Sequence, residues 1–126
     1  MAIRHYRPKR KSTGSRYITS RGKKLCEMGK DPTLPSIGEK KVKSIRTKGA
    51  GRKIRVMGAN IINFTDPVTK KAAKAAMKYV IENPANRHYV RQNALTKGAI
   101  VDTDKGKIRI TSRPAQDGCL NGVLLK

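Results

Sequence analysis

A dense run of positive charge near the N-terminus is the strongest constraint on how this chain can fold. The first 24 residues contain nine Lys or Arg residues and no Asp or Glu. These basic residues are Arg4, Arg7, Lys9, Arg10, Lys11, Arg16, Arg21, Lys23 and Lys24. Such a segment repels itself and has little apolar surface to bury, so we expect it to be disordered in the free protein. A polyanion would order it, because each phosphate that it neutralises releases condensed counterions.

The charge of the whole chain is large but unevenly distributed. Its 126 residues carry a net charge of +22. Positions 1–55 contain 18 basic and 3 acidic residues, whereas positions 56–126 contain 12 basic and 5 acidic residues. This asymmetry indicates a basic arm followed by a folded body, with nucleic acid as the first partner to consider. The two prolines Pro32 and Pro35 interrupt regular structure. We therefore predict a basic extension over 1–36 and a single folded body over 37–126.

Membrane and metal-bound classes find little support in the sequence. No apolar run approaches the ~20 residues that a membrane-spanning helix needs, and the N-terminus lacks the apolar stretch of a signal peptide. We therefore expect an intracellular protein with no membrane partner. The two cysteines, Cys26 and Cys119, fit no zinc-site spacing, and a reducing cytosol disfavours a disulfide between them. We interpret them as small, partly apolar residues.

Alternating apolar and basic residues predict that the body begins with two strands. Val42 and Ile45 precede a Gly-containing turn at 48–51, and Ile54 and Val56 follow it, all among Lys and Arg residues. This period of two predicts one apolar and one cationic face. The pattern therefore favours an antiparallel pair of strands whose outer surface is positively charged.

The next segments predict further strands, with one conflict. A third strand is expected over 59–64, before the turn signal at Asp66-Pro67. The run KKAAKAAMKYVIE at 70–82 has a helix-favouring first half and a strand-favouring second half. We predict a strand over 76–82, while 70–76 remains open between helix and strand. A short helical turn is also predicted over 23–28.

The C-terminal third predicts a hairpin and a closing strand. Segments 98–103 and 107–111 flank Asp104-Lys105-Gly106, where the glycine permits a tight turn. A last short strand is expected over 123–125. Several short strands separated by frequent turn signals predict a mainly β fold, either a small barrel or a sandwich.

The densest candidate site in the body is the polar and basic cluster after Asn83-Pro84. Arginine makes bidentate phosphate contacts, whereas Tyr and His offer stacking faces for bases. Its candidate binding residues are Asn86, Arg87, His88, Tyr89 and Arg91. The alternative is a capped turn, with Asn86 capping a helical turn over 87–93 and a solvated cationic face. The residues alone leave RNA and DNA equally open as ligands.

Catalysis is poorly supported. The chain has only two histidines, His5 and His88, and a ribonuclease mechanism would have to use His88 with a neighbouring cation. Asp102 and Asp104 could hold a weakly bound metal, but a solvated hairpin explains them more simply. We expect no enzymatic activity, no cofactor and no metal site.

Five stretches resemble one protein family. These stretches are GKDPTL at 29–34, IGE at 37–39, ENPANRHYVR at 82–91, TKGAI at 96–100 and TSRPAQDG at 111–118. In order and spacing they are similar to the small-subunit ribosomal protein S8e family of archaea and eukaryotes. The resemblance implies a small β-barrel with a basic, extended N-terminal arm that enters ribosomal RNA. The chain lacks the long insertion typical of eukaryotic members, so it resembles the archaeal type.

The resemblance also implies partners and site residues. The expected partners are small-subunit ribosomal RNA and neighbouring ribosomal proteins, on the cytoplasmic ribosome. The expected RNA-binding residues are the nine arm cations, the arm tyrosines Tyr6 and Tyr17, and the five residues of the cluster at 86–91. Because a ribosome assembly factor shares this domain, that role remains an alternative, as does a general nucleic-acid-binding protein or ribonuclease that is free in the cytosol.

Overall fold

The structure is a computed structural model that describes residues 6–125. The chain divides into two compact units, one ending at Pro32 and the other beginning at Thr33. In the part of the chain that the structure covers, no helix has the length and apolar character to cross a membrane.

The N-terminal unit is mainly extended chain with two local turns. In the first, the backbone N–H of Lys11 donates to the carbonyl of Ser15 over 2.8 Å, and Gly14 takes a φ of 86°. The second is the 3₁₀ turn η1, Leu25–Glu27, which lies inside the helical turn predicted over 23–28. Polar and basic residues dominate this unit, so its chain has little apolar surface with which to build a core.

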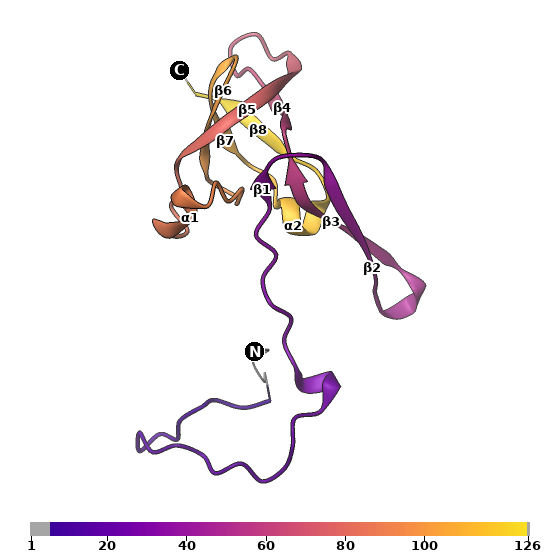
Figure 1. Cartoon of the computed structure of the whole chain (residues 1–126), viewed down its shortest axis with the longest axis vertical. Coiled ribbons are helices and arrows are strands. Elements are labelled where there is room, and N and C mark those ends of the chain that lie inside the picture. The colour runs from indigo at the N-terminus through magenta and orange to yellow at the C-terminus, as the bar shows by residue number, and fades with distance from the viewer. Residues whose placement is uncertain (1–5, 126) are drawn as a thin grey trace. The chain divides into compact units, whose positions relative to one another are not determined.

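The second unit begins with a three-stranded sheet. Its strands are β1 (Ser36–Ile37), β2 (Lys41–Arg46) and β3 (Arg52–Ala59), in the order β1-β3-β2. The 3₁₀ turn η2, Lys48–Ala50, joins β2 and β3 in an antiparallel pair. This pair, here called the ribbon, projects away from the rest of the unit (Figure 1). The predicted pair of strands with a Gly-containing turn is confirmed.

A closed five-stranded barrel follows. Antiparallel pairs connect its strands in chain order, and a parallel pairing between the first and last strands closes it. The mainly β class and the barrel are thus confirmed, although the strands before residue 61 form the separate sheet rather than part of the barrel. The barrel strands are β4 (Ile61–Thr65), β5 (Ala72–Glu82), β6 (Ile100–Thr103), β7 (Gly106–Ile110) and β8 (Asn121–Leu124).

The alanine-rich segment over 70–76, which the sequence left open between helix and strand, is strand from Ala72 onward and forms the first half of β5. This half pairs with β4 in the register Ile61↔Ala76 to Thr65↔Ala72. Ala75 is buried in the barrel interior, where a small side chain fits against the opposite strands. Intrinsic helix propensity differs among ordinary residues by less than ~1 kcal/mol per residue, so tertiary pairing overrides it here.

Two one-turn helices complete the second unit. α1 (His88–Arg91) follows β5, within the helical turn predicted over 87–93. α2 (Pro114–Asp117) was not predicted from the sequence, although Pro at its first position is a helix-start signal. A carboxylate oxygen of Asp117 accepts the N–H of Arg113 over 2.7 Å, which fixes the start of this turn. α2 packs against β3 at the base of the ribbon.

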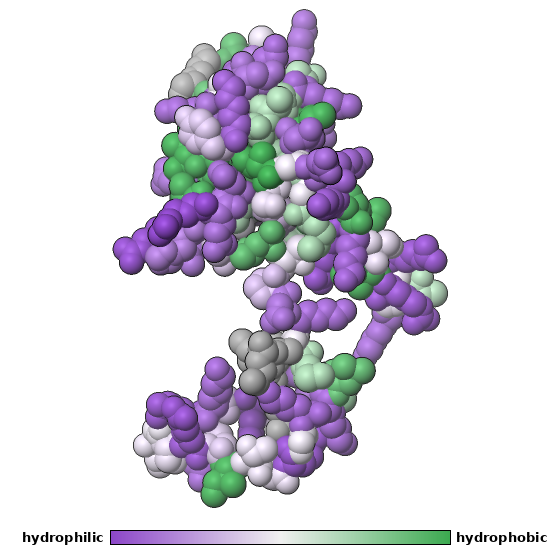
Figure 2. All heavy atoms as spheres, in the orientation of Figure 1, coloured by the Kyte–Doolittle hydropathy of each residue, from purple (hydrophilic) through white to green (hydrophobic). Residues whose placement is uncertain are grey.

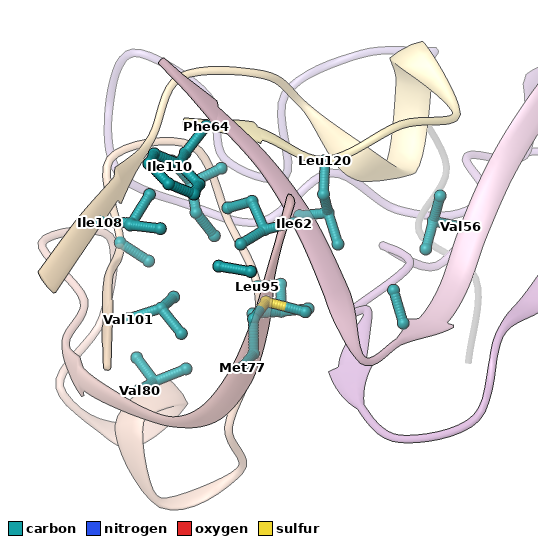
Figure 3. Close-up of a cluster of buried hydrophobic side chains, with 13 residues drawn as sticks. Val56, Ile62, Phe64, Met77, Val80, Leu95, Val101, Ile108, Ile110 and Leu120 are labelled. Carbon is teal, nitrogen blue, oxygen red and sulfur yellow. The ribbon is translucent and has the colours of Figure 1, made fainter. Parts of the chain in front are cut away.

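The core fills the barrel with aliphatic side chains (Figure 3). Ile62, Leu95, Val101 and Ile108 have no exposed surface. The packing is tight at Gly122 of β8, where an added Cβ would lie 2.5 Å from Cγ2 of Ile108 and 2.8 Å from a backbone oxygen. Only glycine fits this position without a shift of the barrel wall.

Candidate nucleic-acid interface

Cations of the N-terminal unit lie over its two tyrosine rings. The guanidinium of Arg7 sits 4.4 Å from the centroid of the Tyr17 ring, and the Lys11 ammonium lies 5.7 Å from the same ring. The Arg21 guanidinium lies 5.3 Å from the centroid of the Tyr6 ring. Cation–π contacts at exposed sites contribute about 0.5–1 kcal/mol each. The arm therefore contains local structure, built from its candidate binding residues.

Arginines of this unit also hold its backbone. Nη2 of Arg7 donates to the carbonyl of Ile18 and Nη1 of Arg10 to that of Gly14, both over 2.8 Å. Arg21 forms an ion pair with Glu27, and this hydrogen bond raises the pKa of Arg21 above its ordinary value.

Most predicted arm residues are exposed. Arg7 is half-buried, while the rest of those described present their side chains to solvent. Arg4 lies outside the described residues. Exposed cations can bind phosphate without first losing a buried partner. The exposed candidates are Tyr6, Lys9, Arg10, Lys11, Arg16, Tyr17, Arg21, Lys23 and Lys24.

In the second unit, Asn83 organises the segment that contains α1. Its side chain is only 5% exposed. Nδ2 donates to the carbonyl of Ala94 over 3.1 Å, while Oδ1 accepts the N–H of Ala85 over 3.1 Å and the hydroxyl of Thr96 over 2.9 Å. Asn83 therefore joins both ends of the α1 segment, and a buried amide with these partners is structural.

Asn86 and Asn93 shape the same segment locally. Oδ1 of Asn86 accepts the N–H of His88 over 2.9 Å in a turn of the Asx type, but the N-cap position of α1 belongs to Arg87 and not to Asn86 as predicted. Oδ1 of Asn93 accepts the N–H of Val80 over 3.1 Å and so attaches the end of the segment to β5. The asparagines of this cluster thus set the backbone, and the charged side chains remain available.

The charged residues of the cluster lie on one exposed turn. Arg87, His88 and Arg91 are exposed, and Tyr89 is half-buried. The structure therefore brings these four predicted residues together around α1, and it places the arm residues in the other unit. Guanidinium groups offer forked donors to phosphate oxygens, and imidazole offers a ring face to a base.

The ribbon is a further cationic surface that the list of candidate residues omitted. Figure 2 shows hydrophilic side chains gathered over it. The signal was present in the sequence, because positions 40–65 contain no Asp or Glu. That pattern predicted a cationic strand face, but none of its residues was among the expected RNA-binding residues. The basic residues of the ribbon are Lys41, Lys43, Arg46, Lys48, Arg52, Lys53 and Arg55.

A cavity of about 350 Å³ lies beside the base of the ribbon. Aliphatic side chains such as Val42, Val56 and Leu120 form much of its wall, and Lys40 and Lys74 also line it. Its described lining residues include no Asp, Glu or His, so this cavity does not resemble a general acid–base site. Among residues 6–125, no three His, Cys, Asp or Glu side chains are grouped as metal ligands would be.

Known proteins match the chain over nearly its whole length. The profile of the family described as ribosomal protein S8e matches residues 4–125. The chain belongs to the ribosomal protein S8e family. The resemblance found in the five sequence stretches is therefore confirmed, and the expectation of a non-enzymatic chain agrees with it, because this is a family of ribosomal proteins and not of enzymes.

Individual S8e relatives come from archaea. The chain is 51% identical to the small ribosomal subunit protein eS8 of Methanocella arvoryzae, over 92% of this chain and 93% of the relative. It is 47% identical to eS8 of Methanobrevibacter smithii over 99% of this chain and 100% of that protein. It is 45% identical to eS8 of Nanoarchaeum equitans, over 95% of this chain and 94% of that protein. The likeness to archaeal members is thus confirmed.

Proposed function

We propose that this chain is a structural component of the small ribosomal subunit that binds ribosomal RNA. The observation that carries the proposal is the 51% identity, over almost the full length of both chains, to a protein whose name places it in the small subunit. The proposal locates the chain on the cytoplasmic ribosome, with ribosomal RNA and neighbouring ribosomal proteins as its partners and no membrane.

The proposed binding residues fall into two groups. One is the arm, with its cations from Arg4 to Lys24 and the rings of Tyr6 and Tyr17. The other is the exposed turn around α1 with Arg87, His88, Tyr89 and Arg91, on the cationic surface of the body. Exposure and charge support both groups, because phosphate contacts from Lys and Arg supply most sequence-independent affinity for nucleic acid. In this proposal Asn86 shapes the α1 turn as well as bordering the RNA.

The proposal also assigns different roles to the two parts of the chain. Residues 1–36 act as the RNA-binding extension, and residues 37–126 form the body that presents α1 and the cationic surface. The ten basic residues in positions 1–36, against two acidic ones, support this division. The arm supplies electrostatic attraction over a long path, and the body fixes the register on the RNA.

Sedimentation of an affinity-tagged chain tests the proposal in an archaeal host. We expect the tagged protein to co-sediment with mature small subunits and to remain in polysomes after a wash at moderate salt. A matched control is an unrelated basic protein with the same tag. Recovery of the chain only in soluble fractions would contradict the proposal. Recovery only with immature particles would favour the assembly-factor alternative.

A further inference from the structure

Two cross-strand pairs of the ribbon place like charges directly opposite each other. Lys43 of β2 faces Arg55 of β3, and Arg46 faces Arg52. Opposed side chains in an antiparallel pair have Cβ atoms about 4.5–5.5 Å apart, and like charges at that spacing destabilise the sheet. In the region that the structure describes, none of these four cations forms an ion pair. The free ribbon therefore carries repulsion that no acidic residue within 6–125 neutralises through an ion pair.

The two faces of the ribbon have different surroundings. Val42, Ile54 and Val56 share the face that turns toward α2, where Val56 is buried and Ile54 approaches Gly118. The opposite face carries the half-buried Ile45 and the three cations Lys43, Arg55 and Lys53. These last three residues, here called the cationic face, are exposed or half-buried.

Local structure holds part of this surface in position. Nη1 of Arg55 donates to the hydroxyl of Thr33 over 3.2 Å. The packing of α2 on β3 and the buried side chain of Val56 anchor the base of the ribbon to the body. The cations are therefore presented on a strand pair and not on a loose loop, so their spacing is set by the sheet.

The composition of the ribbon limits the class of ligand. Positions 36–59 contain no Phe, Tyr, Trp or His, so the ribbon has no aromatic platform on which unpaired bases could stack. Its cations form a two-dimensional array, because alternate residues along a strand are about 6.6 Å apart and a second strand lies about 4.8 Å away. A duplex presents two rows of phosphates, whereas a single strand presents one.

The Arg46–Arg52 pair extends this array to the other face. By the alternation of β2 and β3 it lies opposite the cationic face, near the free end of the ribbon beside η2. Cations on both faces suit an element that lies between two phosphate rows. Double-stranded RNA is recognised mainly by its shape and by contacts to its phosphates and ribose hydroxyls.

We propose that the ribbon is a binding site for the phosphate backbone of double-stranded RNA, with its two like-charge pairs as the contacts. The inference rests on the proposed function and names the form of RNA that this element binds. Phosphate placed between the paired cations replaces their repulsion with attraction, so binding also relieves the destabilisation of the free ribbon.

The test removes one member of each like-charge pair in the full chain. The Lys43→Gln/Arg46→Gln variant is compared with Lys78→Gln/Lys105→Gln, which loses the same charge at exposed positions of β5 and the β6–β7 turn. Affinity for a short RNA duplex and for single-stranded oligouridine is measured by fluorescence anisotropy over a range of salt. We expect the ribbon variant to lower the slope of log affinity against log salt for the duplex by roughly 1.5–2 units.

The same measurements include two further readouts. Oligouridine affinity should be the same in the ribbon variant and the control variant. The melting temperature of the free protein should rise in the ribbon variant, because one charge of each repulsive pair is gone. A charge-conserving variant, Lys43→Arg/Arg46→Lys, should retain duplex binding, which separates charge from shape.

Three outcomes are distinguishable. Equal duplex slopes for the ribbon and control variants would overturn the site. Equal losses on duplex and oligouridine in the ribbon variant would overturn the assignment to double-stranded RNA. Failure of the proposed function would look different, because the unsubstituted chain would then be absent from small subunits in the sedimentation experiment.

Discussion

Replacement of Asn83 by Ala tests whether the α1 segment depends on one buried amide. The side chain is 5% exposed and makes three hydrogen bonds, to Ala94, Ala85 and Thr96, at 2.9–3.1 Å. These contacts join the start of the segment to its end, on either side of the exposed cations. We expect Asn83→Ala to destabilise the body and to loosen the α1 turn.

The magnitude follows from the partners that would be lost. An intramolecular hydrogen bond contributes about 0.5–1.5 kcal/mol, and a buried group left without a partner costs about 1–3 kcal/mol. Ala94 is 1% exposed, so its carbonyl cannot regain a water molecule easily. The three lost hydrogen bonds predict a loss of about 1.5–4.5 kcal/mol in the free energy of unfolding, toward the upper end because the Ala94 carbonyl stays buried. In a body of this size, each kcal/mol lowers Tm by about 4–8 °C.

Urea denaturation of the full chain measures this loss, and Asn86→Ala is the matched control. Asn86 is exposed, and its side chain accepts one hydrogen bond, from the N–H of His88. Its replacement should cost about 0.5–1.5 kcal/mol. Similar losses for the two variants would refute the reasoning, because burial and the number of partners would then not decide the cost. Amide exchange at residues 85–96 should accelerate more in Asn83→Ala than in the control.

Three further predictions concern packing and binding. Gly122→Ala should destabilise the barrel by about 1–3 kcal/mol in urea denaturation, since its Cβ would overlap the barrel wall, whereas Gly38→Ala, with open space at its Cβ, should cost less. Equal costs would contradict the packing argument. Deletion of residues 1–24 removes nine of the 30 basic residues, so the slope of log affinity for ribosomal RNA against log salt should fall by several units. An unchanged slope would show that the body alone carries binding. Arg87→Ala or Arg91→Ala should weaken RNA binding by about 1–3 kcal/mol in a titration and leave the Tm unchanged, whereas a lowered Tm with intact affinity would make the turn structural.

The α1 turn shows how one motif combines a buried structural residue with exposed charged ones. The sequence marks Asn83 to Arg91 as a single polar cluster. The structure separates its members by burial, with Asn83 inside and Arg87, His88 and Arg91 outside. The buried amide of Asn83 fixes the backbone path, and the exposed side chains are then held in one place without being used as structural partners. This separation cannot be seen from residue types alone.

Local features of the fold could be predicted from the sequence because neighbouring residues cause them. Alternation around a Gly-containing turn predicted the ribbon strands, and Asp104-Lys105-Gly106 predicted the β6–β7 hairpin. The excess of basic residues over acidic ones indicated nucleic acid as the first partner to consider, and five short stretches indicated the family that the profile over residues 4–125 confirms. Each signal depends on side chains close together in the chain, or on composition, which needs no knowledge of distant contacts.

Features that depend on distant partners were decided by the tertiary structure. Closure of the barrel pairs Asn63 with Asn121, and no local pattern specifies that parallel contact. The segment from Ala72 to Ala76 is a strand because β4 pairs with it, although alanine favours helix. The like charges of the ribbon face each other only once the register of β2 and β3 is known. Sequence alone thus determined composition, local turns and family, whereas register and burial arose from contacts between residues far apart in the chain.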